Sequence, residues 1–216
     1  MRLVSEIGQE HSVYLVGTGK KSLNRDYSFC HPISLDNNGS NLILAFRACQ
    51  IFLTSFFKSP KFTIRNLNEF LSKPIKRRDI IEFNLKNLIL SLSPDIVHIQ
   101  WATHLLLFES SLNRNTNLPY KIIVSLRGRL INVSPNIDPI VAEIYQNLFP
   151  KVHRFHAVSQ NIKREATRWG ANEENINVVY SGIDLNEIIK YQKKLFLNSS
   201  SLLKILSVGR LNWKKG

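Results

Sequence analysis

The sequence predicts an α/β fold in which helices cover both faces of an open parallel sheet. Runs of apolar residues of strand length alternate with segments of helical periodicity along most of the chain. Several of these runs are almost continuously apolar, which is typical of parallel strands covered on both faces. Apolar residues make up 44% of the 216 positions, enough to build one hydrophobic core.

The first half of the chain is expected to hold two strands and two helices. β-Branched and aromatic residues predict short strands at residues 11–17 and 29–35. Apolar residues at helical spacing predict helices at 41–57 and 78–91. Pro94 closes this region, because a proline disfavours a helical conformation in the residue before it.

Strands and helices alternate more regularly in the second half. Ser159 is well placed to cap a helix at 160–169, and Gly170 to end it. A polar stretch rich in Asn and Ser, at 184–201, is the best linker candidate. It divides a first domain at 1–183 from a second that begins at 202–216. The predicted strands of this half are 95–101, 120–128, 152–159, 174–180 and 202–209.

The chain is strongly basic, with 29 Lys and Arg against 16 Asp and Glu and a net charge of +13. Such a surface favours an anionic partner, and nucleic acid, lipid head groups and phosphorylated small molecules all satisfy it. Cations are dense between Lys58 and Lys86. A solvated basic face without a specific ligand is the alternative for this cluster.

The composition also suggests a compartment. The sequence has no run of 18 apolar residues and no basic-then-apolar start, so a cytosolic location is expected. The two cysteines, Cys30 and Cys49, are too few for a disulfide framework and suit free thiols in a reducing compartment.

Candidate functional residues follow the predicted strands, because ligands of open parallel sheets bind outside the carboxyl ends of the strands. Arginine offers a planar fork of donors to phosphate or carboxylate, tryptophan a stacking face, and glycine a close approach to the backbone. The residues at these ends are Gln100, Trp101, Arg127, Gly128, Ser159, Gly209 and Arg210.

Four runs within about 80–216 then carry a family resemblance by their order and spacing. They are PDIVHIQW, IIVSLRG, HAVSQNIKREATRWGANEENINVVYSGID and ILSVGRLNWKKG. Together they resemble family 4 glycosyltransferases of the two-domain GT-B type. The resemblance implies a Rossmann-like, acceptor-side N-terminal domain and the first strand of the donor-binding domain. Gly182 and Asp184 fall in the turn that leads to the interdomain linker in that family.

The resemblance implies a role for each strand end. Gly209, Arg210 and Lys215 would bind the diphosphate of a nucleotide-sugar donor, a co-substrate, so that neither a metal nor a cofactor is needed. Arg127 replaces the histidine that usually precedes this glycine, and its role would be electrostatic or acceptor-anchoring; a salt-bridged arginine is the alternative. Gln100, Trp101, Gly128 and Ser159 would line the acceptor side of the cleft.

The implied function is transfer of a sugar to a glycan or lipid-linked acceptor, in polysaccharide or glycolipid synthesis. The family usually opens with a strand and a glycine-rich loop, and its donor domain carries a Glu-x7-Glu pair. This sequence matches neither, so the chain by itself is expected to be inactive, as a truncated product, a split-gene fragment or part of a longer protein. An inactive relic of such an enzyme is a further alternative.

Other site chemistries find little support. VGTGKKS, at 16–22, lacks the first glycine and the final Ser or Thr of a phosphate loop. His153 and His156 lie three apart on a predicted strand, so they would point to opposite faces and could not share a metal. Neither cysteine belongs to a Cys-x-x-Cys pair.

A binding module without catalysis remains the competing class. Residues 42–57 and the basic cluster after them could lie on an anionic membrane, peripherally at its inner face, with an ordinary core helix as the alternative. Binding to nucleic acid would need aromatic residues between the cations. Phe62, Phe70 and Phe83 are the candidates, and no specific nucleic acid is expected.

Overall fold

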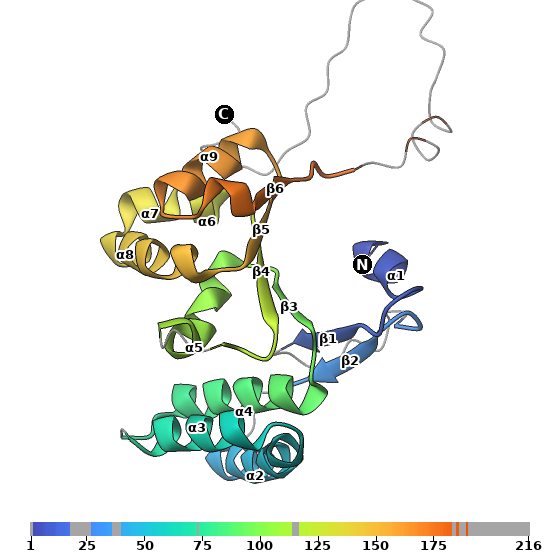
Figure 1. The fold of residues 1–216 in the computed structure, drawn as a ribbon, viewed down its shortest axis with the longest axis vertical. Coiled ribbons are helices and arrows are strands. Elements are labelled where there is room, and N and C mark those ends of the chain that lie inside the picture. The colour runs from blue at the N-terminus through green and yellow to red at the C-terminus, as the bar shows by residue number, and fades with distance from the viewer. Residues whose placement is uncertain are drawn as a thin grey trace, which may run out of the picture. The chain divides into compact units, whose positions relative to one another are not determined.

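The computed structural model describes residues 2–17, 27–35, 40–72, 74–113 and 117–182, together with residues 185 and 189 (Figure 1). Residues 1–180 form one compact unit, and residues 181–216 belong to a second. The predicted boundaries at 183/184 and 201/202 fall among residues outside the described ranges, so they stay predictions.

Parallel strands flanked by helices confirm the predicted α/β class. In the described part of the chain the strands form two sheets, one of two strands and one of four, and every pairing is parallel. The smaller sheet pairs β1 with β2, and the larger has the order β3-β4-β5-β6. The strands are β1 Tyr14–Gly17, β2 His31–Ser34, β3 Ile96–Ile99, β4 Lys121–Leu126, β5 Arg154–Ala157 and β6 Ile176–Val178.

Helices account for the rest of the regular structure. Those of the first half are α1 Arg2–Ile7, α2 Asn41–Lys58, α3 Pro60–Leu71 and α4 Arg77–Leu92. Those of the second half are η1 Ala102–Phe108, α5 Glu109–Asn113, α6 Arg129–Asn132, α7 Ser134–Ile137, α8 Pro139–Leu148, η2 Phe149–Lys151, α9 Gln160–Arg168 and η3 Glu173–Asn175, where η marks a 3-10 helix.

The helix ends confirm three predictions. The Ser159 hydroxyl accepts a hydrogen bond from the Ile162 amide at 3.2 Å and so caps α9. Gly170 follows that helix with φ 98°, a left-handed conformation that suits glycine. Ser93, just before Pro94, has φ 49° and ends α4, as expected of a residue that a proline excludes from the helix.

The strands are shorter than the sequence predicts. Predicted strand 95–101 is observed at Ile96–Ile99, and Gln100 leads into the 3-10 helix η1. Predicted strand 174–180 is observed at Ile176–Val178, after the turn η3. The apolar runs continue past the ladder, but their last residues are exposed: Trp101 is 48%, Val179 58% and Tyr180 65% exposed. The polar strand-end residues therefore lie just beyond the strands.

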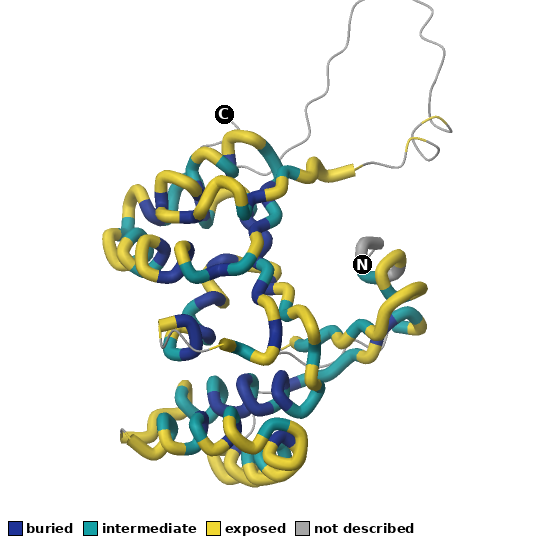
Figure 2. The backbone as a smooth tube through the Cα atoms, in the orientation of Figure 1, coloured by how far each residue is buried: buried dark blue, intermediate teal, exposed yellow. Residues whose placement is uncertain are grey.

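The core covers one face of the four-stranded sheet. Alternate residues of β4 and β5 point into it, among them Ile122, Val124 and Phe155, each at most 1% exposed. Aromatic rings continue the core into the helices, with centroids 4.5 Å apart for Tyr145 and Phe149 and 5.2 Å apart for Phe149 and Phe155. Figure 2 shows the buried segments of α8 and α9 turned toward the strands.

Helices α2, α3 and α4 pack together through a mixed interface. The Asn84 side chain, on α4, donates to the Leu44 carbonyl of α2 at 3.3 Å. The Arg77 guanidinium donates to the Asn41 side chain at 2.9 Å, at the start of α2. Apolar contacts accompany these bonds, since α2 buries Leu44 completely.

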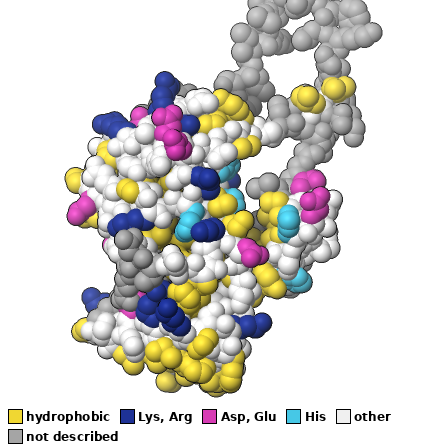
Figure 3. Space-filling view, viewed as in Figure 1, with side chains coloured by type: hydrophobic (Ala, Val, Ile, Leu, Met, Phe, Trp, Pro, Cys, Tyr) yellow, Lys and Arg dark blue, Asp and Glu magenta, His cyan; other side chains and the backbone are white. Residues whose placement is uncertain are grey.

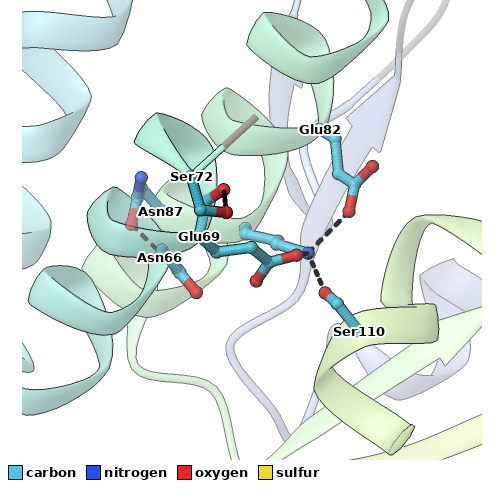
Figure 4. Close-up of polar contacts among 7 residues, drawn as sticks. Asn66, Glu69, Ser72, Glu82, Asn87 and Ser110 are labelled. Atoms are coloured by element: carbon cyan, nitrogen blue, oxygen red, sulfur yellow. Dashed lines mark hydrogen bonds and ion pairs between the residues drawn. The ribbon is translucent and has the colours of Figure 1, made fainter. Parts of the chain in front are cut away.

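Most described cations of the basic stretch 58–86 are exposed, but Lys86 is buried. Whether the exposed cations have a specific ligand stays a prediction. Pro60–Leu71 forms helix α3, which the sequence did not predict. The Lys86 Nζ lies 2.6 Å from a Glu82 oxygen and 3.4 Å from a Glu69 oxygen, and it donates to the Ser110 hydroxyl at 2.5 Å. Figure 4 shows the side chains of Glu69, Glu82 and Ser110 converging on one amino group.

Prediction for Lys86. Because Lys86 is 5% exposed and neutralises two carboxylates, Lys86→Met should lower the free energy of unfolding by about 3–5 kcal/mol. Lys61→Met is the matched control on exposed α3 surface and should change it by less than about 0.5 kcal/mol. Urea denaturation measures both values. Equal stability of the two variants would contradict the buried ion cluster.

Candidate functional site

Two of the predicted site residues meet at the carboxyl edge of the four-stranded sheet. Gln100 follows β3 and Arg127 follows β4, and the two strands pair in parallel. An Arg127 Nη2 donates to the Gln100 Oε1 at 3.3 Å. The Arg127 Nε is buried and has no hydrogen-bond partner within the described ranges. The arginine is therefore held at one end, and it has a donor left for another oxygen.

Gly128 directly follows this arginine and opens the short helix α6. Its φ of 44° and ψ of −127° form a conformation that residues with a side chain rarely adopt. No described atom lies within 4 Å of the place where a Cβ would stand, so space beside this glycine is open. The backbone here can accept a close ligand.

Trp101 and Ser159 occupy the ends of neighbouring segments. Trp101 is 48% exposed and precedes η1, where its carbonyl accepts from the His104 amide at 2.9 Å. The Ser159 hydroxyl is already committed to capping α9. The acceptor-side role predicted for both residues stays a prediction.

A row of polar side chains crosses the sheet beside these strand ends. The His98 Nε2 lies 2.9 Å from the Ser125 Oγ, which lies 3.1 Å from the His156 Nδ1. The His156 Nε2 lies 3.1 Å from the Val179 carbonyl oxygen, just past β6. At the other end the His98 Nδ1 lies 3.4 Å from the Gln100 Nε2.

We call this row, from Arg127 through Gln100, His98, Ser125 and His156 to the Val179 carbonyl, the polar chain. The sequence-based prediction named Gln100 and Arg127 but missed the histidines and the serine. A usable signal was present, because His98 and Gln100, like Ser125 and Arg127, lie two residues apart in or beside apolar strands. This period of two places them on one face of the sheet.

The electrostatics of the polar chain favour the neutral form of His98. His98 is an exposed residue of β3, but its partial desolvation lowers its pKa below the ordinary value, and the charges of His156 and Arg127 lower it further. The four described strands β3 to β6 contain no Asp or Glu that could oppose this effect. The edge therefore presents donors and positive charge, a combination suited to an anionic or hydroxyl-rich ligand.

His153 serves a different contact from His156. Its Nδ1 accepts a hydrogen bond from the Ile122 amide at 3.1 Å, whereas the His156 Nδ1 faces Ser125. Burial lowers the pKa of His153, with a smaller contribution from the Lys121 charge. Among the residues that the structure describes, no three His, Cys, Asp or Glu side chains gather as a group that could hold a metal ion.

The remaining predicted residues cannot be placed at the edge. Asp184, Gly209, Arg210 and Lys215 lie outside the described residues, so the expected meeting of Arg127 with Arg210 stays a prediction. Gly182 is described and exposed, but it belongs to the second unit.

The fold and the polar edge of its sheet together define a class of domain. Parallel strands and flanking helices make this a Rossmann-like α/β domain, with polar groups just beyond its strand ends. The model of Glycosyltransferase Family 4 matches residues 49–187, and the chain therefore belongs to that family. Neither a curated protein nor a solved structure matches the chain.

Prediction for His98. Because the Arg127 charge lowers the pKa of His98, Arg127→Met should raise that pKa toward the ordinary value. Arg129→Met removes an exposed charge two residues on and is the matched control, with no change expected. NMR titration of the imidazole measures both. A His98 pKa that is the same in both variants would contradict the effect of the Arg127 charge on His98.

Prediction for acid stability. Folding favours neutral His98, so the unfolded chain takes up its proton first as the pH falls below about 6.5. The contribution of His98 to stability should be complete above this pH and decline through the lower pKa of the folded chain. Urea midpoints of the wild type and His98→Asn, compared between pH 7.5 and 5, test this. A variant that loses stability as steeply as the wild type would contradict it.

Proposed function

We propose that this chain is the acceptor-side domain of a glycosyltransferase that uses a nucleotide-diphosphate-sugar donor. One observation carries the proposal: the Arg127–Gln100 contact stands beside the open backbone of Gly128, at the carboxyl edge of a Glycosyltransferase Family 4 domain. A sugar acceptor offers hydroxyl oxygens, and the nucleotide-sugar co-substrate offers phosphate oxygens. The edge supplies the complementary donors.

Arg127 would act by charge and hydrogen bonding. A guanidinium remains protonated at neutral pH, so it cannot serve as an acid or base. Its buried Nε donor gains about 1–3 kcal/mol when an oxygen pairs with it. The proposed role is to orient the acceptor or to stabilise charge that develops during transfer.

The donor would be held by the segment that contains Gly209, Arg210 and Lys215. Two cations and a glycine amide can neutralise the departing diphosphate without a metal ion. These residues follow in sequence and lie outside the described structure, so this part of the proposal rests on the family resemblance alone. No resident cofactor is proposed.

A lipid-linked acceptor is favoured by the outer surface of α2. Leu42, Phe46, Leu53 and Phe57 recur at helical spacing along it, and the first and last are each 83% exposed. In Figure 3 hydrophobic side chains gather at the lower end of the molecule, where Figure 1 shows α2. We call these four residues the α2 stripe.

Cations lie at both ends of the α2 stripe. Lys58 is the last residue of α2, and the bond from Arg77 to Asn41 brings the basic start of α4 to the first turn. The sequence has no Asp or Glu between Asp36 and Glu69. Apolar side chains bordered by cations complement an anionic lipid surface, where each nearby cation contributes about 1 kcal/mol. No helix of the described residues is long and apolar enough to cross a bilayer.

Nucleic acid is a weaker partner for this surface. Phe83 is buried, and its ring lies 4.7 Å from that of Phe70. Phe62 is partly buried against the core. Base stacking needs an exposed aromatic face, and these three rings are used in packing instead.

Prediction for activity. In the longest natural polypeptide that contains this chain, Arg127→Met should lower kcat/KM about 100- to 1,000-fold, the effect of losing one preorganised charge. Arg127→Lys should be intermediate, because it keeps the charge and loses the fork. Arg129→Met is the matched control and should keep wild-type activity. Sugar transfer from a panel of labelled nucleotide sugars gives the values, and full activity of Arg127→Met would refute the proposed role.

Prediction for membrane binding. The chain should sediment with phosphatidylglycerol-containing vesicles at low salt, and binding should weaken as salt screens the cations. Phe46→Ser with Phe57→Ser should weaken binding at least about 10-fold. Ile137→Ser with Ile140→Ser removes two exposed apolar residues elsewhere, 66% and 68% exposed, and should have no effect. Absence of binding at low salt, or equal losses of binding in the two double variants, would exclude the α2 stripe as a membrane-binding surface.

A further inference from the structure

The polar chain ends in two groups whose hydrogen-bonding roles are fixed. A guanidinium can only donate, so the Gln100 atom that faces Arg127 must be its oxygen. A backbone carbonyl can only accept, so the His156 Nε2 that faces Val179 must carry a hydrogen. The two ends are independent of each other.

These two ends determine every proton between them when both imidazoles are neutral. His156 carries its hydrogen on Nε2, so its Nδ1 accepts from the Ser125 hydroxyl. Ser125 has one proton to give, and its oxygen must accept from the His98 Nε2. The His98 Nδ1 is then bare and accepts from the Gln100 amide.

The same orientation of Gln100 results from either end. The Val179 end requires the Gln100 NH2 to face His98. The Arg127 end requires the Gln100 oxygen to face the guanidinium. The five hydrogen bonds therefore all run in one direction, with both histidines as Nε2–H tautomers. No donor meets a donor along the polar chain.

Ser125 is the central link of this arrangement. It is 1% exposed on β4, between Val124 and Leu126, which are fully buried. A buried hydroxyl is costly unless it is bonded, and an apolar residue would suit this strand equally well for packing. Ser125 offsets that cost by joining two imidazoles from neighbouring strands.

We propose that Ser125, His98 and Gln100 are positioning residues, which hold the Arg127 guanidinium in one orientation through a hydrogen-bond chain anchored at the Val179 carbonyl. This inference rests on the proposed function, because Arg127 is the group whose orientation would matter for transfer. It concerns the orientation of the arginine, and it assigns roles to His98 and Ser125, which lie outside the strand-end residues named from the sequence.

Protonation of His98 would break the link to Arg127. A hydrogen on its Nδ1 would face the Gln100 NH2, and turning that amide would set its NH2 against the guanidinium. Other charged or titratable groups at odd positions of β4 and even positions of β5, on the same sheet face, are Lys121, Arg154 and His156. None of these three is an acid that would favour protonation of His98.

NMR of the 15N-labelled 216-residue chain tests this inference directly. Two-bond 1H–15N correlations at pH 7.5 should show neutral Nε2–H tautomers for both His98 and His156. His153 is an internal reference, because its Nδ1 accepts from the Ile122 amide and should give the same tautomer without Ser125. A charged or Nδ1–H form of His98 or His156 would overturn the inference.

Substitutions then test the connection to Arg127. Ser125→Ala should make the His98 Nε2–H exchange with water at least about 10-fold faster, the effect of one lost hydrogen bond. It should also shift the Arg127 side-chain signals and leave His153 unchanged, whereas Ser125→Thr keeps the hydroxyl and should restore the wild-type pattern. Unchanged His98 and Arg127 signals in Ser125→Ala would count against the inference.

A second variant covers the case in which Ser125→Ala does not fold. Gln100→Met alters an exposed side chain and removes the same link from outside the core. It should shift the Arg127 signals and leave the His156 tautomer as in the wild type. Unshifted Arg127 signals in this variant would overturn the positioning role.

Activity separates this inference from the proposed function. In the longest natural polypeptide, Ser125→Ala should lower kcat about 10-fold at little cost in KM, and Ser125→Thr should recover it. Loss of activity in Arg127→Met but not in Ser125→Ala would remove the positioning role alone. If both histidines show the expected tautomers but Arg127→Met is fully active, the proposed function is refuted. The inferred direction of the hydrogen bonds would still stand.

Discussion

Parallel pairing of β3, β4 and β5 is the constraint on which the candidate site depends. The register sets Ser125 opposite His156 and His98 opposite Ile123. Ile123 lies two residues before Ser125 in β4, so both point to the same face of the sheet. Because parallel strands end at a common edge, polar residues at equivalent positions of separate segments become neighbours. Residues 27 and 31 positions apart thus meet without any local motif to bring them together.

The same alternation gives the sheet two different faces. Inward positions of β4 and β5 are apolar and buried, and Phe155 of β5 packs against Phe149. The intervening positions carry Ser125 and His156, which satisfy one another across the strands. Packing on one side therefore holds the backbone on which the geometry of the other side depends.

How much could be predicted depends on whether a residue acts locally. The α/β class, the Ser159 cap, the Gly170 stop and the break at Pro94 follow from patterns within a few residues, and the structure confirms them. Helix α3 was missed because its buried side includes Thr63 and Asn66, which look like surface residues. Their burial depends on partners from other segments, such as Asn87, whose side chain accepts from Asn66 at 3.0 Å.

The residues of the candidate site also differ in whether local sequence is enough to predict their role. Gln100 and Arg127 could be predicted because strand ends are recognisable, but the roles of His98, Ser125 and His156 depend on register, which a single sequence does not specify. Lys86 is the clearest case, since a lysine in a basic run is ordinarily solvated and here sits among carboxylates. The proposed donor residues lie outside the described structure and remain predictions.

Helix α2 is apolar on its outer side as well as its inner side, so hydrophobicity alone would let it pack against α4 in more than one rotation. Two polar contacts remove that ambiguity. The Asn84 amide reaches the Leu44 carbonyl, and Arg77 reaches Asn41. Rotating α2 would leave the buried Asn84 amide without its hydrogen-bond acceptor, which costs about 1–3 kcal/mol. Asn84 thus fixes the rotation of α2 about its own axis. A substitution of Asn84 would let α2 rotate and bury the phenylalanines of its outer side.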